Sequence, residues 1–118
     1  MQMSFPNKVS LAEAHQKLGE VSAVFLEVFR HGTLSVELYQ PEGEDKQTPH
    51  SRDEVYIIAA GEAVFELEGQ KTQIKTGDFL FVPAQAKHRF VEFSENFSTW
   101  VLFYGPEGGE NALNATQK

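Results

Sequence analysis

Alternation of apolar and polar residues dominates the chain after residue 20 and predicts a series of short strands. The run TLSVELY at residues 33–39 places its leucines and valine on one side and its serine, glutamate and tyrosine on the other. Short strands separated by turn signals at regular spacing are typical of an antiparallel sandwich or barrel. The other strand-like runs are AVFLEVF (23–29), EVYIIAA (54–60), EAVFELE (62–68), KTQIK (71–75), DFLFVP (78–83), HRFVEF (88–93) and FSTWVLFY (97–104).

One segment has the period of a helix instead. Ser10 and Glu13 have the spacing of a capping box, and Gly19 is a natural stop. We therefore expect one short helix at about residues 10–18. Its apolar face consists of Leu11, Ala14, His15 and Leu18.

Two of the four histidines have a structural interpretation. His15 lies on the apolar side of the predicted helix, so we expect it to be packed or half-buried. His31 precedes Gly32 in a predicted tight turn, where a surface position is expected.

Composition narrows the classes of function. The chain has 118 residues, enough for one domain with a core. Ten basic and seventeen acidic residues give a net charge of −7, which argues against a nucleic-acid partner. The absence of cysteine excludes disulfides and thiolate metal sites. No apolar run approaches the ~18 residues of a membrane span, and no signal peptide pattern is present, so we expect a cytoplasmic protein without a membrane partner.

The domain organisation follows from the same pattern. We expect an N-terminal arm at residues 1–9, a single domain at residues 10–104, and a loosely held, polar, Gly-rich tail at residues 105–118. A polar loop separates two of the predicted strands. Its acidic residues are expected to be solvated, namely Glu42, Glu44 and Asp45.

The other two histidines lie in patterned sequence. His50 is followed after four residues by Glu54, and Gly61 comes seven residues later. The second pattern consists of Gly77, Pro83 and His88.

Together these patterns resemble the two motifs of the cupin superfamily, specifically of its small single-domain members. The first motif is G-x5-H-x-H-x3,4-E-x6-G and the second is G-x5-P-x-G-x2-H-x3-N. The resemblance spans roughly residues 33–104 and implies an all-β fold. In this fold a small antiparallel jelly-roll barrel, here with one short N-terminal helix, binds a metal inside its mouth.

The chain departs from both motifs. His50 occupies the second histidine position, Thr48 stands in the first, and Gly43 is one residue too close to it. In the second motif Gln85 replaces the glycine and Glu92 replaces the final asparagine.

An alternative register makes His50 the first histidine and Arg52 the second. Glu54 would then follow too soon, so we prefer the first register. Both registers retain His50, Glu54 and His88 as the metal ligands.

Two imidazoles and one carboxylate suit a divalent first-row metal, and the same set forms the facial triad of non-haem iron sites. These ligands accept Fe, Mn, Ni, Co or Zn, so the sequence does not identify the metal. Three protein ligands leave positions open for water or substrate. With Thr48 in place of a histidine, the site is more open, and Gln47 and Thr48 are alternative oxygen donors.

The strand period also predicts which side chains line a pocket beneath the metal. Tyr56 and Ile58 share the face of Glu54, and Phe90 shares that of His88. Val55, Ile57, Lys87 and Arg89 should point the other way. Two further candidates have structural alternatives: Arg52 as a substrate anchor or a solvated loop charge, and Trp100 as a stacking or a core residue.

The resemblance implies a divalent-metal-binding protein, with small-molecule oxidation or isomerisation as the candidate reactions. Two alternatives remain open: a non-catalytic small-molecule binding module, and a metal-free isomerase in which a histidine acts as the base. The family and the apolar edge expected at AVFLEVF also predict a homodimer.

Overall fold

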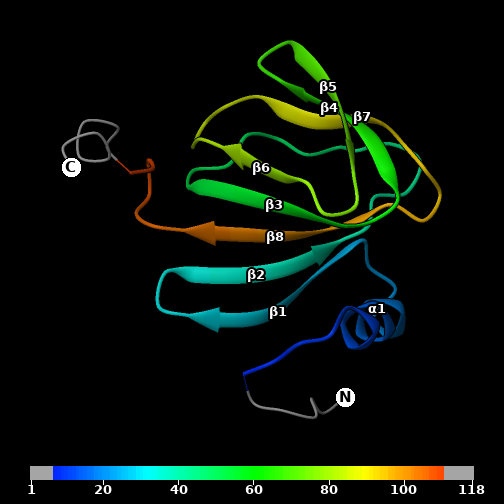
Figure 1. Ribbon diagram of the computed structural model, residues 1–118. Helices are drawn as coiled ribbons and strands as arrows, with labels where there is room; N and C mark the ends of the chain where they lie inside the picture. The colour runs from blue at the N-terminus through cyan, green and yellow to red at the C-terminus, as the bar shows by residue number, and fades with distance from the viewer. Residues whose placement is uncertain (1–6, 111–118) are drawn as a thin grey trace.

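The chain folds into two antiparallel sheets and one helix, as the computed structural model describes for residues 7–110 (Figure 1). One sheet has the strand order β1-β2-β8-β3-β6 and the other has the order β5-β4-β7. The elements are α1 Leu11–Glu20, β1 Phe25–His31, β2 Leu34–Tyr39, β3 Asp53–Ala60, β4 Glu62–Leu67, β5 Gln70–Lys75, β6 Phe79–Val82, β7 His88–Phe93 and β8 Ser98–Tyr104.

The predicted all-β class with one N-terminal helix is confirmed, and every strand-like run forms a strand. Most boundaries differ from the predicted ones by one or two residues, and two of these differences change an interpretation. The helix passes through Gly19 and ends at Glu20, and β1 extends through His31, so that its turn begins at Gly32. His31 is exposed, as expected. Within the described residues, no helix has the length and apolar character needed to cross a membrane.

The helix packs on the outer face of β1 and β2 (Figure 1). Its capping box forms as predicted: Glu13 donates its backbone N–H to Ser10 Oγ at 3.1 Å, and Ser10 donates its own to Glu13 Oε1 at 3.0 Å. Leu38 is fully buried against the helix. His15 is half-buried, with its Nε2 3.2 Å from Ser98 Oγ. Helix and sheet thus bury the outward side of β2.

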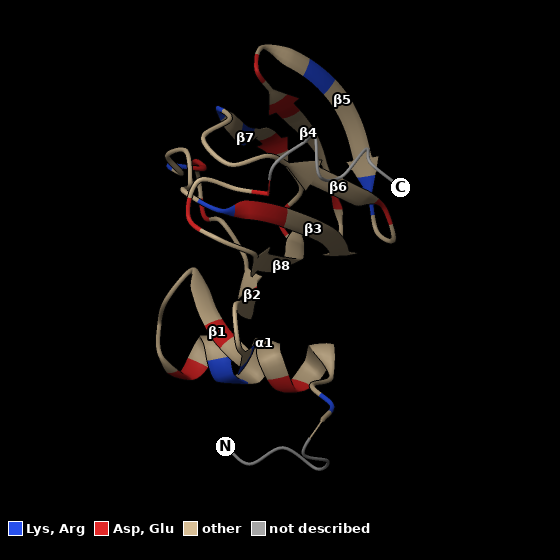
Figure 2. Cartoon of the chain, turned by 90° about the vertical axis from the view of Figure 1, so that its left-hand side faces the viewer, with Lys and Arg blue, Asp and Glu red and all other residues tan. Residues whose placement is uncertain are grey.

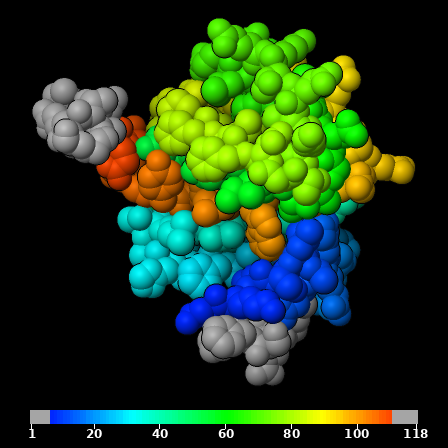
Figure 3. Space-filling model, viewed as in Figure 1, coloured from blue at the N-terminus to red at the C-terminus, as the bar shows by residue number. Residues whose placement is uncertain are grey.

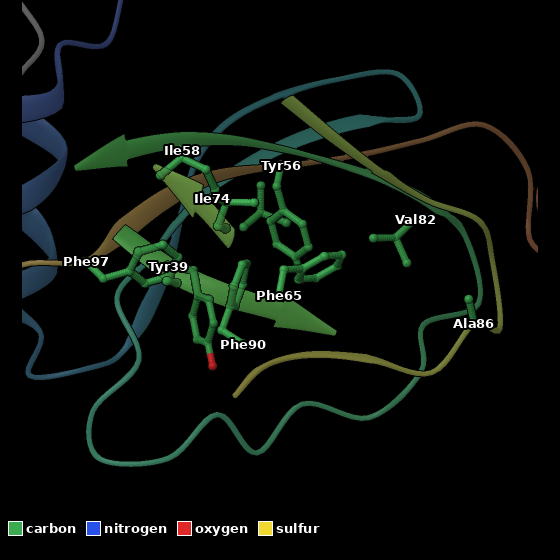
Figure 4. Close-up of a cluster of buried hydrophobic side chains, with 11 residues drawn as sticks. Tyr39, Tyr56, Ile58, Phe65, Ile74, Val82, Ala86, Phe90 and Phe97 are labelled. Atoms are coloured by element: carbon green, nitrogen blue, oxygen red, sulfur yellow. The ribbon is translucent and has the colours of Figure 1, made fainter. Parts of the chain in front are cut away.

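Aromatic rings fill the space between the two sheets (Figure 4). Phe90 of β7 is central, with ring centroids 5.0 Å from Tyr56, 5.2 Å from Phe65 and 4.8 Å from Phe97. Tilted and edge-on ring pairs at these distances add to the free energy gained by burial. The core therefore joins both sheets through rings contributed by each.

The described chain after β8 is hydrogen bonded to β3 and to the loop before it. Glu110 donates its backbone N–H to Asp53 Oδ2 at 2.8 Å, and Gly108 donates to Ser51 O at 2.6 Å. Residues 105–110 of the expected loose tail are therefore tied down. Residues 111–118 of that tail, and residues 1–6 of the expected arm, lie outside the described residues.

The outward face of β3 and β6 remains apolar and open. Ile57, Phe79 and Phe81 are 39, 63 and 44% exposed, and β6 lies on the surface in the yellow-green region of Figure 3. β1 is an edge strand, which agrees with the unpaired edge expected from AVFLEVF. The homodimer stays a prediction.

Gly61 connects β3 to β4 where the chain passes close to the segment before β8. Its φ is +79°, and a Cβ would lie 2.5 Å from Ser94 Oγ and 2.8 Å from Phe97 Cα. Gly69 has a similar φ of +85°, but a Cβ there would meet nothing within 4 Å.

This contrast predicts the effect of adding one methyl group. Gly69→Ala should cost about 1 kcal/mol of unfolding free energy through left-handed backbone strain. Gly61→Ala should cost a further ~1–3 kcal/mol because of the steric clash. Urea unfolding of both variants measures the difference, and equal losses would contradict the predicted clash.

Candidate metal centre

The three predicted ligands come from both sheets and meet at one end of the molecule. His50 lies in the loop before β3, Glu54 is the second residue of β3, and His88 begins β7 in the opposite sheet. His88 Nε2 is 3.2 Å and His50 Nε2 is 3.9 Å from Glu54 Oε1. One ligand atom from each residue lies within 4.8 Å of the other two. The acidic segment at the start of β3 is visible in Figure 2.

The three candidate ligands are buried to different extents, and the most buried of them, Glu54, has no hydrogen-bond partner among the described residues. Glu54 is fully buried and His88 is nearly so, whereas the His50 side chain is 32% exposed. Both Glu54 carboxylate oxygens and His88 Nε2 are buried without a hydrogen-bond partner among the described residues. A buried carboxylate without partners is costly, and a divalent cation would satisfy these atoms together. The donor set therefore fits a first-row metal.

Hydrogen bonds and burial set the ring orientation of His88 and shift the pKa of both imidazoles. His88 Nδ1 is 2.9 Å from Ala86 O, so Nδ1–H donates to this carbonyl and Nε2 faces Glu54. Burial lowers the pKa of His88, but the Glu54 carboxylate and the Ala86 carbonyl outweigh it and raise the pKa overall. Burial lowers the pKa of His50 despite the nearby Glu54. His50 also packs edge-on against Phe103, with centroids 5.0 Å apart.

Asp45 corrects the expectation of a solvated acidic loop. Glu42 and Glu44 are exposed as predicted, but Asp45 is only 4% exposed. Its carboxylate accepts hydrogen bonds from Tyr39 OH at 2.6 Å and from the Phe90 backbone N–H at 2.8 Å. A carboxylate within a Pro- and Gly-rich loop has no local sequence pattern that marks its burial, so only its tertiary partners reveal it.

Asp45 also holds Gln47, which lies beside the candidate ligands. Asp45 accepts from the Gln47 backbone N–H at 3.2 Å and from its Nε2 at 3.0 Å. The Gln47 amide oxygen accepts from Tyr56 OH at 3.0 Å and lies 3.3 Å from His50 Nε2. A chain of polar contacts thus runs from the core to His50.

A cavity of about 580 Å³ opens over the candidate centre. Its lining includes His50, Glu54, Val101 and Phe103, together with Glu37, which was not among the predicted site residues. In the sequence, Glu37 alternates with the leucines and valine of residues 33–39, a pattern that favours a solvent-facing position. The helix covers the leucine side of β2 instead, so Glu37 lies on the side of the cavity and no local signal identifies it.

None of the predicted pocket residues lines the cavity. Tyr56, Ile58 and Phe90 point inward as predicted, but they fill the core rather than line the cavity. Arg52 donates to the backbone carbonyls of Thr33 and Gly105, which joins two turns. Trp100 lies on the other face of the sheet and packs against the helix cluster. Their role in substrate binding stays a prediction.

Comparison with known sequences assigns the family. A family model described as a cupin domain matches residues 35–102. The chain belongs to the cupin family. An uncharacterized protein from Streptomyces coelicolor is 35% identical to this cupin over 85 residues, covering 70% of this chain and 81% of that protein.

Solved structures show the same fold. KdgF from a Halomonas species matches with a TM-score of 0.61 and 21% identity, covering 70% of this cupin and 78% of that chain. A cupin superfamily protein from Desulfitobacterium hafniense matches with a TM-score of 0.58 and 22% identity over 70% and 76%. The DMSP lyase DddQ from Ruegeria pomeroyi has a TM-score of 0.52 and 28% identity over 64% of this chain and 40% of the lyase.

Removing the Asp45 carboxylate should destabilise the fold. Asp45→Ala leaves the Phe90 N–H and the Tyr39 hydroxyl without their buried acceptor, at ~1–3 kcal/mol for each such group. Urea unfolding should show this loss, and Glu44→Ala, at an exposed neighbour in the same loop, should stay within ~0.5 kcal/mol of wild type. Matching stabilities for the two variants would refute the proposed role of Asp45.

Glu37 should make stability depend on pH. Burial, and then the carboxylates of Glu27 and Glu54, raise its pKa above the ordinary value of 4.5. The folded state therefore binds the proton more tightly than the unfolded state, so stability falls as pH rises from about 4.5 through the folded pKa.

Glu37→Gln removes this dependence. In protein freed of metal by a chelator, the variant should gain unfolding free energy relative to wild type as pH rises from ~4 to 7. Chemical denaturation at a series of pH values measures the gap. A gap that stays constant over this range would contradict the raised pKa.

Proposed function

We propose that this cupin binds one divalent first-row cation through His50, Glu54 and His88 and presents it to a small molecule in the cavity. The observation that carries the proposal is the fully buried Glu54 carboxylate, with both oxygens unpartnered among the described residues, beside two imidazoles. His88 Nε2 lies 3.2 Å from Glu54 Oε1, and a divalent cation would satisfy this nitrogen and both carboxylate oxygens together.

Each residue has a distinct part in this function. Glu54 supplies the negative charge that holds the cation, and the imidazoles supply neutral nitrogen donors. The Ala86 carbonyl keeps the His88 ring oriented through Nδ1. A bound metal would supply Lewis acidity, which polarises an oxygen of a small molecule. The partly exposed His50 lies on the side from which that molecule would approach.

The cavity lining favours ligands without dense negative charge. Three carboxyl groups besides Glu54 line it, those of Glu37, Glu42 and Glu44, against the single ammonium of Lys46. Phe103 and Val101 supply an apolar wall. A neutral or cationic small molecule with an apolar body matches this surface.

Metal-centred catalysis on such a molecule is the reaction class that we propose. The cupin motifs support oxidation or isomerisation as candidate reactions. The 28% identity to a protein named as a DMSP lyase supports catalysis rather than simple binding.

Metal binding tests the proposal directly. Wild-type protein purified without chelators and titrated with Co²⁺ should bind one equivalent, with a rise in melting temperature that grows with Co²⁺ concentration. His88→Ala should lose this binding, because one nitrogen donor is gone. His31→Ala, at an exposed histidine of β1, should behave as wild type. Equal Co²⁺ binding by His88→Ala and wild type would disprove the proposed site.

A further inference from the structure

Three protein ligands leave the proposed centre one donor short of the first cupin motif, because Thr48 stands where the motif has a histidine. The neighbouring residue places an oxygen at the site instead. Gln47 Oε1 lies 3.3 Å from His50 Nε2 and accepts the Tyr56 hydroxyl at 3.0 Å. Gln47 also lines the same cavity as His50 and Glu54.

The orientation of the Gln47 amide is fixed by its partner. Gln47 Nε2 donates to Asp45 Oδ2 at 3.0 Å, and a carboxylate can only accept. Flipping the amide would set its oxygen against the carboxylate oxygen. Asp45 is buried and held by the Phe90 N–H, so it is a rigid acceptor. The oxygen of Gln47, rather than its nitrogen, is therefore turned toward His50.

The spacing of the donor atoms matches a shared cation. Two ligands at ~2.1 Å from one metal lie roughly 3.0–3.4 Å apart in octahedral or tetrahedral arrangements. The Gln47–His50 pair at 3.3 Å and the His88–Glu54 pair at 3.2 Å both fall in this range. The His50–Glu54 pair is wider, at 3.9 Å.

We propose that Gln47 supplies its amide oxygen as the fourth protein ligand of the metal, replacing the histidine that is absent at Thr48. This inference rests on the proposed metal-binding function. Two nitrogens, a carboxylate and an amide oxygen form a harder donor set than three imidazoles and a carboxylate. Such a set shifts preference toward harder ions such as Mn²⁺ and Fe²⁺, relative to softer ones.

The test compares Co²⁺ binding by wild type, Gln47→Met and Gln73→Met. Methionine keeps the length of the side chain and removes the amide, and Gln73 is an exposed glutamine of β5 that serves as the matched control. Gln47→Met should bind Co²⁺ at least about tenfold more weakly and change the visible d–d absorption of the bound ion. Gln73→Met should match wild type in both affinity and spectrum.

The outcomes separate this inference from the proposed function. If Gln47→Met keeps wild-type affinity and spectrum, Gln47 is not a ligand and the three-residue site stands. If Thr48→Val weakens Co²⁺ binding while Gln47→Met does not, the fourth ligand is the Thr48 hydroxyl oxygen and the inference fails. If wild type itself binds no Co²⁺, both proposals fail.

Gln47 also donates a hydrogen bond to Asp45, so the Gln47→Met variant loses a structural contact as well as the proposed ligand. A second measurement therefore uses the wild-type protein. In a wild-type crystal soaked with Co²⁺, the anomalous peak should lie at coordination distance from Gln47 Oε1, ~2.0–2.3 Å. A cobalt peak bound by His50, Glu54 and His88, with Gln47 Oε1 beyond ~3 Å, would overturn the assignment.

Discussion

The buried carboxylate of Asp45 fixes the loop between β2 and β3 against the core. It accepts the backbone N–H of Phe90 at the centre of the aromatic cluster, the hydroxyl of Tyr39, and both donors of Gln47. These bonds satisfy its charge in the interior, which would otherwise be costly. Through Gln47, the same loop holds His50 beside the start of β3. The candidate centre therefore depends on a structural carboxylate outside the ligand set.

Two buried carboxylates thus have opposite surroundings. Asp45 is saturated with donors, whereas both oxygens of Glu54 have no hydrogen-bond partner among the described residues. His88 Nε2 lies 3.2 Å from Glu54 Oε1, whereas Oε2 has no hydrogen-bond partner, so the cost of burying this carboxylate is only partly compensated among the described residues. Local instability of this kind is common at functional sites, where a ligand supplies the missing interaction. The contrast between the two acids is the strongest physical argument for a cation at Glu54.

The predictions from sequence succeed where a residue's role follows from a local period. Spacing predicts the capping box of Ser10, and the structure agrees. The strand period, with Glu54 placed inward by the cupin resemblance, predicts the inward side of Tyr56 and Ile58, which the structure also has. Trp100 lies on the face opposite the cavity because it pairs with Leu38 across β2 and β8, beneath the helix. Strand alternation fixes its relation to its neighbours but does not say which face a helix will cover.

The sequence by itself determined the all-β class, the family motifs and the identity of three candidate ligands, because strand period and motif spacing are properties of neighbouring residues. Only the tertiary structure decided that His88 meets Glu54 across two sheets and that Asp45 is buried. It also decided that Glu37 and Gln47 line the cavity beside His50 and Glu54. These positions depend on pairing between strands and loops far apart in the chain. A loop residue such as Asp45 acquires its partners only when the sheets close over it.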